Sequence, residues 1–263
     1  MQWVSYLGIG ALVGFAAGLL GIGGGVVMVP LLVFVLTASG INPDQVLHVA
    51  LGTGLAAMVF TSVSSMRAHH AHGAVDWRIA RAMSPGMLIG SFGAALIAGF
   101  IPTRPLAVMF TALVFYAATQ ILLDLRPRTT RELPGAAGLF GAGAFIGAVS
   151  SLMAAGGAFL SIPFLAWCNV PIRRAIGTAA ANGLPIAIAG TTGYILNGLH
   201  AEGLPAFSVG YVYLPALALI VSTSTLAAPM GARLAHRLPI KRLRTIFAFL
   251  LYGFAIKMLV GIW

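Results

Sequence analysis

The feature that most constrains the fold is a glycine-dense interruption between two apolar runs near the start of the chain. Residues Gly18 to Pro30 read GLLGIGGGVVMVP, with one apolar run from Val4 to Leu20 and another from Val26 to Leu36. Glycines at this density break a helix, because each tolerates positive φ and leaves the backbone conformationally loose. At membrane depth, proteins tolerate such a break only where the freed N–H and C=O groups are buried in protein or face an aqueous cavity.

Composition places this break in a membrane. The chain of 263 residues is 59% hydrophobic and only 8% charged, with a mean hydropathy of +0.98. A soluble domain carries roughly 25% charged residues. The formal net charge of +10 comes from basic residues in short loops between apolar runs, which is typical of the positive-inside bias and does not indicate nucleic-acid binding. The single cysteine, Cys168, excludes an internal disulfide and a multi-cysteine metal site.

We therefore predict an all-α, polytopic helical membrane protein. The expected apolar elements are 4–20, 26–37, 45–67, 77–100, 104–124, 135–153, 157–168, 172–198, 206–235 and 240–261. A bilayer span needs about 20 residues, so the elements at 26–37 and 157–168 are too short to cross alone. Each is expected to form a re-entrant-like or broken hairpin with the element before it, and the sequence leaves open whether that hairpin crosses fully.

The second half of the chain repeats the layout of the first. Ser150 to Pro163 reads SSLMAAGGAFLSIP, in which Gly156-Gly157 match Gly23-Gly24 and Pro163 matches Pro30. We expect one integral membrane domain made of a first repeat at 1–124, a cytoplasmic linker at 125–134 and a second repeat at 135–263. Five elements in each half put every Arg-rich and Lys-rich loop in the cytoplasm, with both termini periplasmic. Because five is odd, the repeats are inverted, and paired breaks of this kind are a pointer to a transporter's binding site.

The amides that open the second helix of each hairpin carry the positive end of a helix dipole, which suits an anion. Hydroxyl and amide side chains near the breaks, including those after a repeated Gly-Thr pair, are further donors. The candidate substrate-binding residues are Gly23, Gly24, Gly25, Thr53, Ser150, Ser151, Gly156, Gly157, Thr178 and Asn182. The alternatives are that small residues only let helices pack closely and that membrane Ser and Thr bond their own helix.

Charged and titratable groups narrow the chemistry further. His48, Arg173 and Arg174 flank the repeated motif, and we expect them to act in gating or charge attraction, unless they are merely interfacial. All five acidic residues fall in loops or at helix ends, where they would not form the mid-membrane carboxylate that proton and sodium pumps usually keep. An anion site fits this inventory and a cation site does not. Neither a metal nor a cofactor is expected, and the histidines at 69, 70 and 72 are interpreted as a solvated loop.

The motifs together resemble those of the sulfite exporter TauE/SafE family. The resemblance rests on GLLGIGGGVVMVPLL, its echo SSLMAAGGAFLSIPFL, the Gly-Thr segments at 52–53 and 177–178, and PMGARLAHRLP at 229–239, and it covers essentially the whole chain. It implies an inner-membrane transporter for small sulfur-containing anions such as sulfite, sulfoacetate or related sulfonates, often working as an exporter. Ala154, Ala155 and Ala158 stand where the first break has Gly21, Ile22 and Gly25, so the two hairpins need not contribute equally.

The resulting expectation is a secondary transporter or facilitator in a bacterial inner membrane. Its partners are the lipid bilayer and a small sulfur-containing anion, with no nucleic acid, and a homodimer is left open. The alternatives are a passive anion channel and a transporter for another small organic anion. An intramembrane enzyme is disfavoured because the sequence has no HExxH motif, no paired membrane aspartates and no nucleophile with a partnering base.

Overall fold

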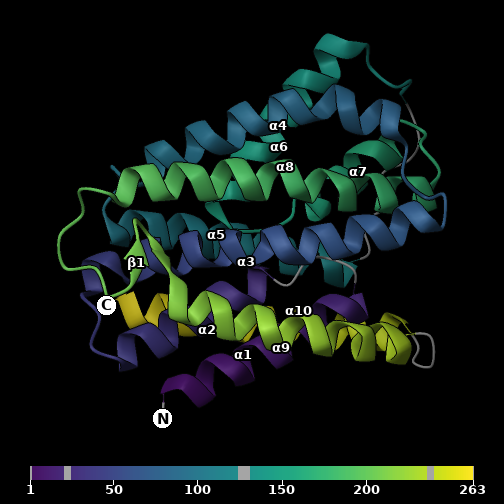
Figure 1. Ribbon diagram of the computed structural model, residues 1–263. Coiled ribbons are helices and arrows are strands. Elements are labelled where there is room, and N and C mark those ends of the chain that lie inside the picture. The colour runs from purple at the N-terminus through teal and green to yellow at the C-terminus, as the bar shows by residue number, and fades with distance from the viewer. Residues whose placement is uncertain (1, 21–24, 124–130, 236–239, 263) are drawn as a thin grey trace.

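The computed structural model describes residues 2–20, 25–123, 131–235 and 240–262, and in this part of the chain it contains ten helices and one short β-hairpin (Figure 1). The helices are α1 (Gln2–Leu20), α2 (Gly25–Ala38), α3 (Pro43–Ala71), α4 (Trp77–Ala98), α5 (Thr103–Leu123), α6 (Ala136–Leu152), α7 (Ala158–Trp167), α8 (Ile172–Gly198), α9 (Leu214–Ala235) and α10 (Ile240–Ile262). The strands are β1 (Ser208–Val209) and β2 (Val212–Tyr213). The predicted all-α class is confirmed.

Two predicted local structures are wrong. Residues 206–213, expected at the start of a helix, form the β1–β2 hairpin, because Phe207 and Gly210 have φ of 65° and 54°. The Tyr211 N–H also donates to the Tyr194 carbonyl, which ties this hairpin to α8. At the other end of the bundle, α3 continues to Ala71, so the histidines at 69 and 70 are helical and do not lie in a loop.

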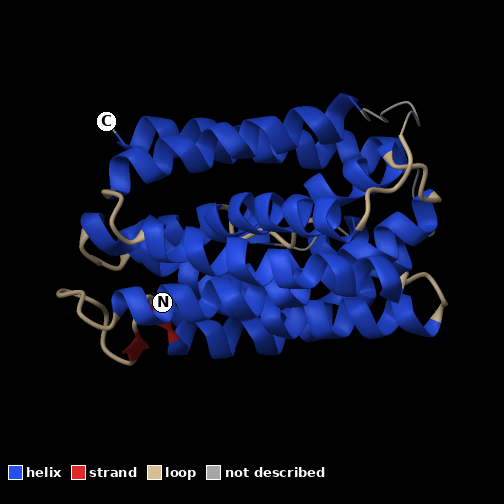
Figure 2. Ribbon diagram, turned by 90° about the horizontal axis from the view of Figure 1, so that it is seen from above, coloured by secondary structure: helices blue, strands red, loops and turns tan. Residues whose placement is uncertain are grey.

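The helices run roughly along one direction and define two ends of the bundle (Figures 1 and 2). The strand end contains the β1–β2 hairpin, the start of α3 and the end of α8. The linker end contains the end of α5 and the start of α6. Helices α3 and α8 pack against each other through the centre and are antiparallel, whereas α1 packs on α9, α4 on α6, and α5 on α10. The N- and C-termini both lie toward the strand end.

Glycine stripes bring two of these helix pairs into close backbone contact. A Cβ atom on Gly10 or Gly14 of α1 would overlap backbone atoms of α9, and a Cβ on Gly143 or Gly147 of α6 would overlap backbone atoms of α4. Lipid tails are as apolar as the side chains, so membrane helices associate largely through such close packing of small residues. Both stripes have the glycine-x-x-x-glycine spacing, which places the glycines on one helix face.

Both broken hairpins return to the end at which they begin. Helix α2 leads into α3 at the strand end, where α1 also begins. Helix α7 ends at the linker end, where the Arg131 N–H donates to the Trp167 carbonyl and the Arg131 guanidinium lies 4.6 Å from the centre of the Trp167 ring. This path is the one expected of re-entrant-like hairpins, whose relation to the bilayer stays a prediction.

Helices α3 and α5 are each long and apolar enough to span a bilayer by themselves, judged from the described residues. Helix α3 is mostly buried inside the bundle and α5 lies nearer its surface. Large apolar side chains such as Phe60, Ile89 and Phe145 are exposed on the outside, as expected of surfaces that face lipid.

Candidate functional site

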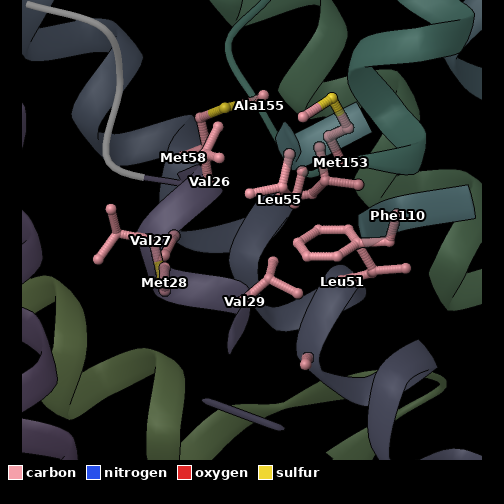
Figure 3. Close-up of a cluster of buried hydrophobic side chains, with 14 of the residues drawn as sticks. Val26, Val27, Met28, Val29, Leu51, Leu55, Met58, Phe110, Met153 and Ala155 are labelled. Carbon is pink, nitrogen blue, oxygen red and sulfur yellow. The ribbon is translucent and has the colours of Figure 1, made fainter. Parts of the chain in front are cut away.

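The start of α2 meets the second break in the middle of the bundle. A Cβ atom on Gly25, the first residue of α2, would overlap the carbonyl oxygen of Ala154 in the second break, and one on Gly54 of α3 would lie 3.3 Å from the Ala154 Cβ. Figure 3 shows Met153 and Ala155 of the second break in one buried apolar cluster with Val26 of α2. The first helix residue after the first break therefore lies against the second break, whereas the candidate residues Gly23 and Gly24 lie outside the described residues.

The second break holds a group of buried polar side chains without partners. Ser150, Ser151, Ser161 and Asn182 are each 0% exposed. Within the described structure, the three serine hydroxyls and the Asn182 Oδ1 have no hydrogen-bond partner. Buried polar groups nearly always find a partner, because an unsatisfied one costs about 1–3 kcal/mol. The three serine hydroxyls are thus available as donors to a bound polar group, whereas the Asn182 Nδ2 donates to the Met83 Sδ at 3.7 Å and leaves only its acceptor oxygen free.

Backbone donors lie in the same place. Helix α7 begins at Ala158 after Gly157, whose φ of 71° is left-handed and turns the chain into the helix. Among the described residues, the amides from Gly156 to Phe159 make no hydrogen bond, whereas the amides of Leu160 and Ser161 both bond the Gly157 carbonyl. Free amides at the start of a helix carry the positive end of its dipole and bind anions.

One face of α8 covers this break. Asn182, Ile186 and Gly190 are spaced four residues apart and share that face. A Cβ on Gly157 would lie 2.7 Å from the Ile186 Cδ1 and 3.2 Å from the Ser150 Oγ, and one on Gly190 would lie 2.9 Å from the Ser151 Oγ. Because α8 spans 172–198, this contact lies at its mid-length, halfway between the two ends of the bundle.

The repeated Gly-Thr pairs occupy matching structural positions. A Cβ on Gly52 would overlap the Tyr211 carbonyl oxygen, and the Tyr213 N–H donates to the Thr53 Oγ1 at 3.0 Å. In the second half, a Cβ on Gly177 would overlap the Ala74 carbonyl oxygen, and the Asp76 N–H donates to the Thr178 Oγ1 at 3.0 Å. We call these the strand-end clip (Gly52, Thr53 and residues 211–213) and the linker-end clip (Gly177, Thr178 and residues 74–76).

Both clip threonines are fully buried, and their oxygens accept bonds that hold the start of another helix. Substrate contact by Thr53 and Thr178 stays a prediction, but the structure assigns each a packing role that the sequence analysis did not anticipate. The usual alternative for a membrane threonine, a bond to the carbonyl of residue i−4, is the pattern found at Thr111 and Thr192.

The flanking groups lie next to the clips and away from the serines. His48 is buried at the strand end, with its Nε2 3.0 Å from the Ala98 carbonyl oxygen and its ring stacked on Tyr211 at a centroid separation of 5.1 Å. Arg173 and Arg174 are exposed at the linker end, and Arg174 approaches the Asp76 carboxylate at 3.9 Å. The predicted gating or charge-attraction role of these three residues remains untested.

The polar side chains belong to the second break and have apolar counterparts in the first. The repeat that matches Pro163 to Pro30 places Ser161 opposite Met28, and the repeat that matches Thr178 to Thr53 places Asn182 opposite Ala57. Both counterparts are buried, and Figure 3 shows Met28 among the apolar side chains of α2. Ser161 was missed by the sequence analysis, although its position one turn after Gly157 is the signal that would have identified it.

Other polar side chains that the sequence singled out serve packing. The hydroxyls at positions 222–225 bond carbonyls one turn earlier in α9, and Thr223 and Ser224 lie against the glycine stripe of α1. This run of hydroxyl side chains therefore serves contact between helices. The His70 Nδ1 accepts from the Trp77 Nε1 at 3.1 Å, and within the described residues no group of three or more His, Cys, Asp or Glu side chains could hold a metal ion.

A bundle of mostly apolar helices, with the start of α2 against the second break at its centre and unsatisfied polar groups beside that contact, is typical of a multi-pass membrane protein of the transporter class. The chain belongs to the sulfite exporter TauE/SafE family, whose model matches residues 6–258. The resemblance noted from the sequence motifs is therefore confirmed.

Individual relatives agree with this assignment. A probable membrane transporter protein of Haemophilus influenzae is 36% identical over 252 residues, covering 95% of each chain. A protein of the same description from Bacillus subtilis is 30% identical over 196 residues, covering 71% of this chain and 76% of the relative. A third, from Methanocaldococcus jannaschii, is 26% identical over 258 residues, covering 96% and 93%. No solved structure matches the chain significantly.

Proposed function

We propose that this membrane transporter moves small sulfur-containing anions such as sulfite, sulfoacetate or related sulfonates, and that it binds them at the second break. The observation that carries the proposal is the coincidence of free helix-start amides with buried, unpartnered side chains. Among the unpartnered polar side chains, Ser150 lies closest to the left-handed Gly157, with its Oγ 3.2 Å from the position that a Cβ on Gly157 would take. An oxyanion offers several acceptor oxygens at once, which matches a group of donors better than a single polar partner would.

The same site argues against cations. The acidic residues of the described chain, Asp44, Asp76, Glu132 and Glu202, lie in loops or at helix starts, so none is close to the break. A cation in this position would meet backbone N–H groups and the positive end of the α7 dipole. We place the site in a bacterial inner membrane with the basic linker end in the cytoplasm and both termini periplasmic, as the positive-inside rule requires.

Alternating access is proposed to arise from two inverted repeats, 1–124 and 135–263, joined by the linker at 125–134. The helix pairs support this division. Helix α1 of the first repeat packs on α9 of the second, and their counterparts, α6 of the second repeat and α4 of the first, pack on each other in the same way. Pro30 and Pro163 each lie five residues after the start of their helix, which aligns the two breaks. The antiparallel packing of α3 against α8 is what an inverted repeat places at its central axis.

A passive anion channel is the alternative, and the meeting of the two breaks favours a carrier. Gly25 and Ala154 are in backbone contact, so the described tips leave no open path between them. A carrier gives saturable flux in proteoliposomes, with exchange faster than net movement. Ohmic single-channel currents would instead identify a channel.

The test of the proposed site is a pair of matched serine variants. Ser150→Ala removes one donor to a charged group, worth about 1.5–3 kcal/mol, so we expect sulfite or sulfoacetate to bind roughly 10- to 150-fold more weakly. Ser222→Ala is the control, because that serine is exposed on α9 and its hydroxyl donates to the Leu219 carbonyl. Binding is measured as the rise in melting temperature that the ligand causes, with sulfate and chloride for comparison. Equal affinity of the Ser150 and Ser222 variants for the anion would refute the proposed site.

A further inference from the structure

We propose that the strand-end clip and the linker-end clip are the two gates of the transporter, one on each side of the central site. The inference rests on the proposed alternating access but not on the identity of the anion. Each clip consists of a glycine that faces a carbonyl oxygen and a threonine whose oxygen accepts an N–H bond two residues further along the partner segment. The two clips have the same construction, yet they lie at opposite ends of the bundle.

Each clip joins one half of the chain to the other. Thr53 lies on α3 and holds the start of α9 through Tyr213, whereas Thr178 lies on α8 and holds the start of α4 through Asp76. Each bond therefore links a central helix to the start of a helix of the opposite repeat. A relative movement of the two repeats therefore opens a clip, which is the movement that alternating access requires.

Both clips lie directly beside the site. Gly54, the residue after Thr53, lies against Ala154 of the second break. Asn182 is one helical turn beyond Thr178 and belongs to the face of α8 that covers that break. A clip is thus the first layer that a solute meets on leaving the site toward either end.

Additional contacts reinforce each clip with different chemistry. At the linker end, the Arg174 guanidinium approaches the Asp76 carboxylate at 3.9 Å. At the strand end, His48 stacks on Tyr211 and its Nε2 lies 3.0 Å from the Ala98 carbonyl oxygen. The two gates share their threonine bond and differ in these outer contacts, so they can be weakened separately.

The experiment measures which side of the membrane reaches the site. Cys168→Ser removes the single native thiol, and Ser150→Cys places a reporter at the break. Thr53→Val or Thr178→Val then removes one acceptor at nearly constant side-chain volume. A membrane-impermeant maleimide is added to right-side-out and to inside-out vesicles. Thr192→Val is the control, because Thr192 is exposed on the same helix as Thr178 and bonds its own helix.

We expect Thr53→Val to raise labelling from the strand-end side and lower it from the linker-end side, and Thr178→Val to do the reverse. The change is about fivefold, the shift in population that loss of one net hydrogen bond produces. The serine variants, Thr53→Ser and Thr178→Ser, keep the acceptor and should label like the parent. A purely structural role would loosen both sides alike, so an equal rise on both sides, or no change on either, overturns the proposal.

A gentler variant keeps the test decisive if a valine variant does not fold. Asp76→Asn removes the ion pair with Arg174 but retains a side chain that caps α4, so the fold is preserved. It should raise labelling from the linker-end side only, and a rise from the strand-end side would contradict the gate assignment. Labelling needs no substrate, so failure of sulfite to bind would refute the proposed function and leave this result standing.

Discussion

Two adjacent glycines at the second break allow the role of backbone conformation to be tested with a single methyl group. Gly157 has a φ of 71°, and a Cβ there would lie 2.7 Å from the Ile186 Cδ1 and 3.2 Å from the Ser150 Oγ. Gly156 lies outside the left-handed region, and its Cβ would meet only the Met58 Sδ, at an ordinary 3.6 Å. The same substitution is therefore expected to have opposite effects at the two positions.

The magnitude follows from the backbone. A left-handed conformation costs a non-glycine residue roughly 1–2 kcal/mol. For a protein of about this size, 1 kcal/mol lowers the melting temperature by about 2–4 °C, so Gly157→Ala should melt about 2–8 °C lower, before any cost of moving Ile186. Gly156→Ala restricts the unfolded chain at a compatible site and should be neutral or stabilising by up to about 1 kcal/mol.

The assay uses a reporter that the chain already contains. Cys168 is the single cysteine and is buried, so a thiol-reactive dye reports its exposure as the protein unfolds in detergent. Gly157→Asn separates strain from crowding, because asparagine tolerates positive φ but still fills the space beside Ser150. It should recover stability without recovering anion binding. If Gly157→Ala melts with or above Gly156→Ala, the left-handed entry to α7 is not the constraint that we describe.

Three further predictions concern stability and thiol reactivity. Gly90→Ala should destabilise the protein by about 1–3 kcal/mol, because its Cβ would overlap Ala144 backbone atoms of α6. Gly93→Ala on the same helix has open space at its Cβ and should be neutral or stabilising, and thermal unfolding compares the two variants. Asp76→Ala should lower the free energy of unfolding by about 0.5–2 kcal/mol, because α4 loses its N-cap. Asp76→Asn should lower it by less than about 1 kcal/mol, because asparagine still caps the helix and only an exposed ion pair is lost. Chemical denaturation of the two variants measures the difference. Burial raises the pKa of the Cys168 thiol, and the charge of Arg131 partly opposes this rise. Alkylation of the folded protein should therefore be slow at pH 7 and should still accelerate as the pH rises past the ordinary thiol pKa. Fast labelling at pH 7 would contradict the burial of this thiol.

The sequence was sufficient for the features that local patterns encode. The ten helices of the described residues were predicted because apolar runs, polar loops and glycine density mark them, although α9 begins eight residues later than expected. The second break was found because it repeats the layout of the first. The β1–β2 hairpin was missed because it depends on positive φ at Phe207 and Gly210 and on contact with α8. No local sequence pattern predicts that contact.

The candidate site was predictable in composition and less so in detail. Ser150, Ser151 and Gly157 were selected because they lie at the break in the chain, and Asn182 because it follows the repeated Gly-Thr pair by one helical turn; the structure places Asn182 on the face of α8 that covers the break. Thr53 and Thr178 were selected by repetition; their contact with substrate stays a prediction, and the sequence analysis did not anticipate the backbone amides from which their oxygens accept bonds. A repeated motif predicts a repeated environment, and in this fold the environment common to both threonines is the amide of a crossing segment.

The asymmetry of the two breaks bears on how many anions one chain holds. Two repeats of the same fold create two equivalent positions near the centre, and an anion needs donors that survive burial. The second position has Ser161, whose hydroxyl has no partner among the described residues, whereas the matching residue of the first position is Met28, which cannot donate a hydrogen bond through its side chain. Under the proposed function we therefore expect the side-chain donors to come from the second half of the chain. We expect the first hairpin to supply an apolar wall and a moving partner, so that each chain carries one site that faces the two sides in turn.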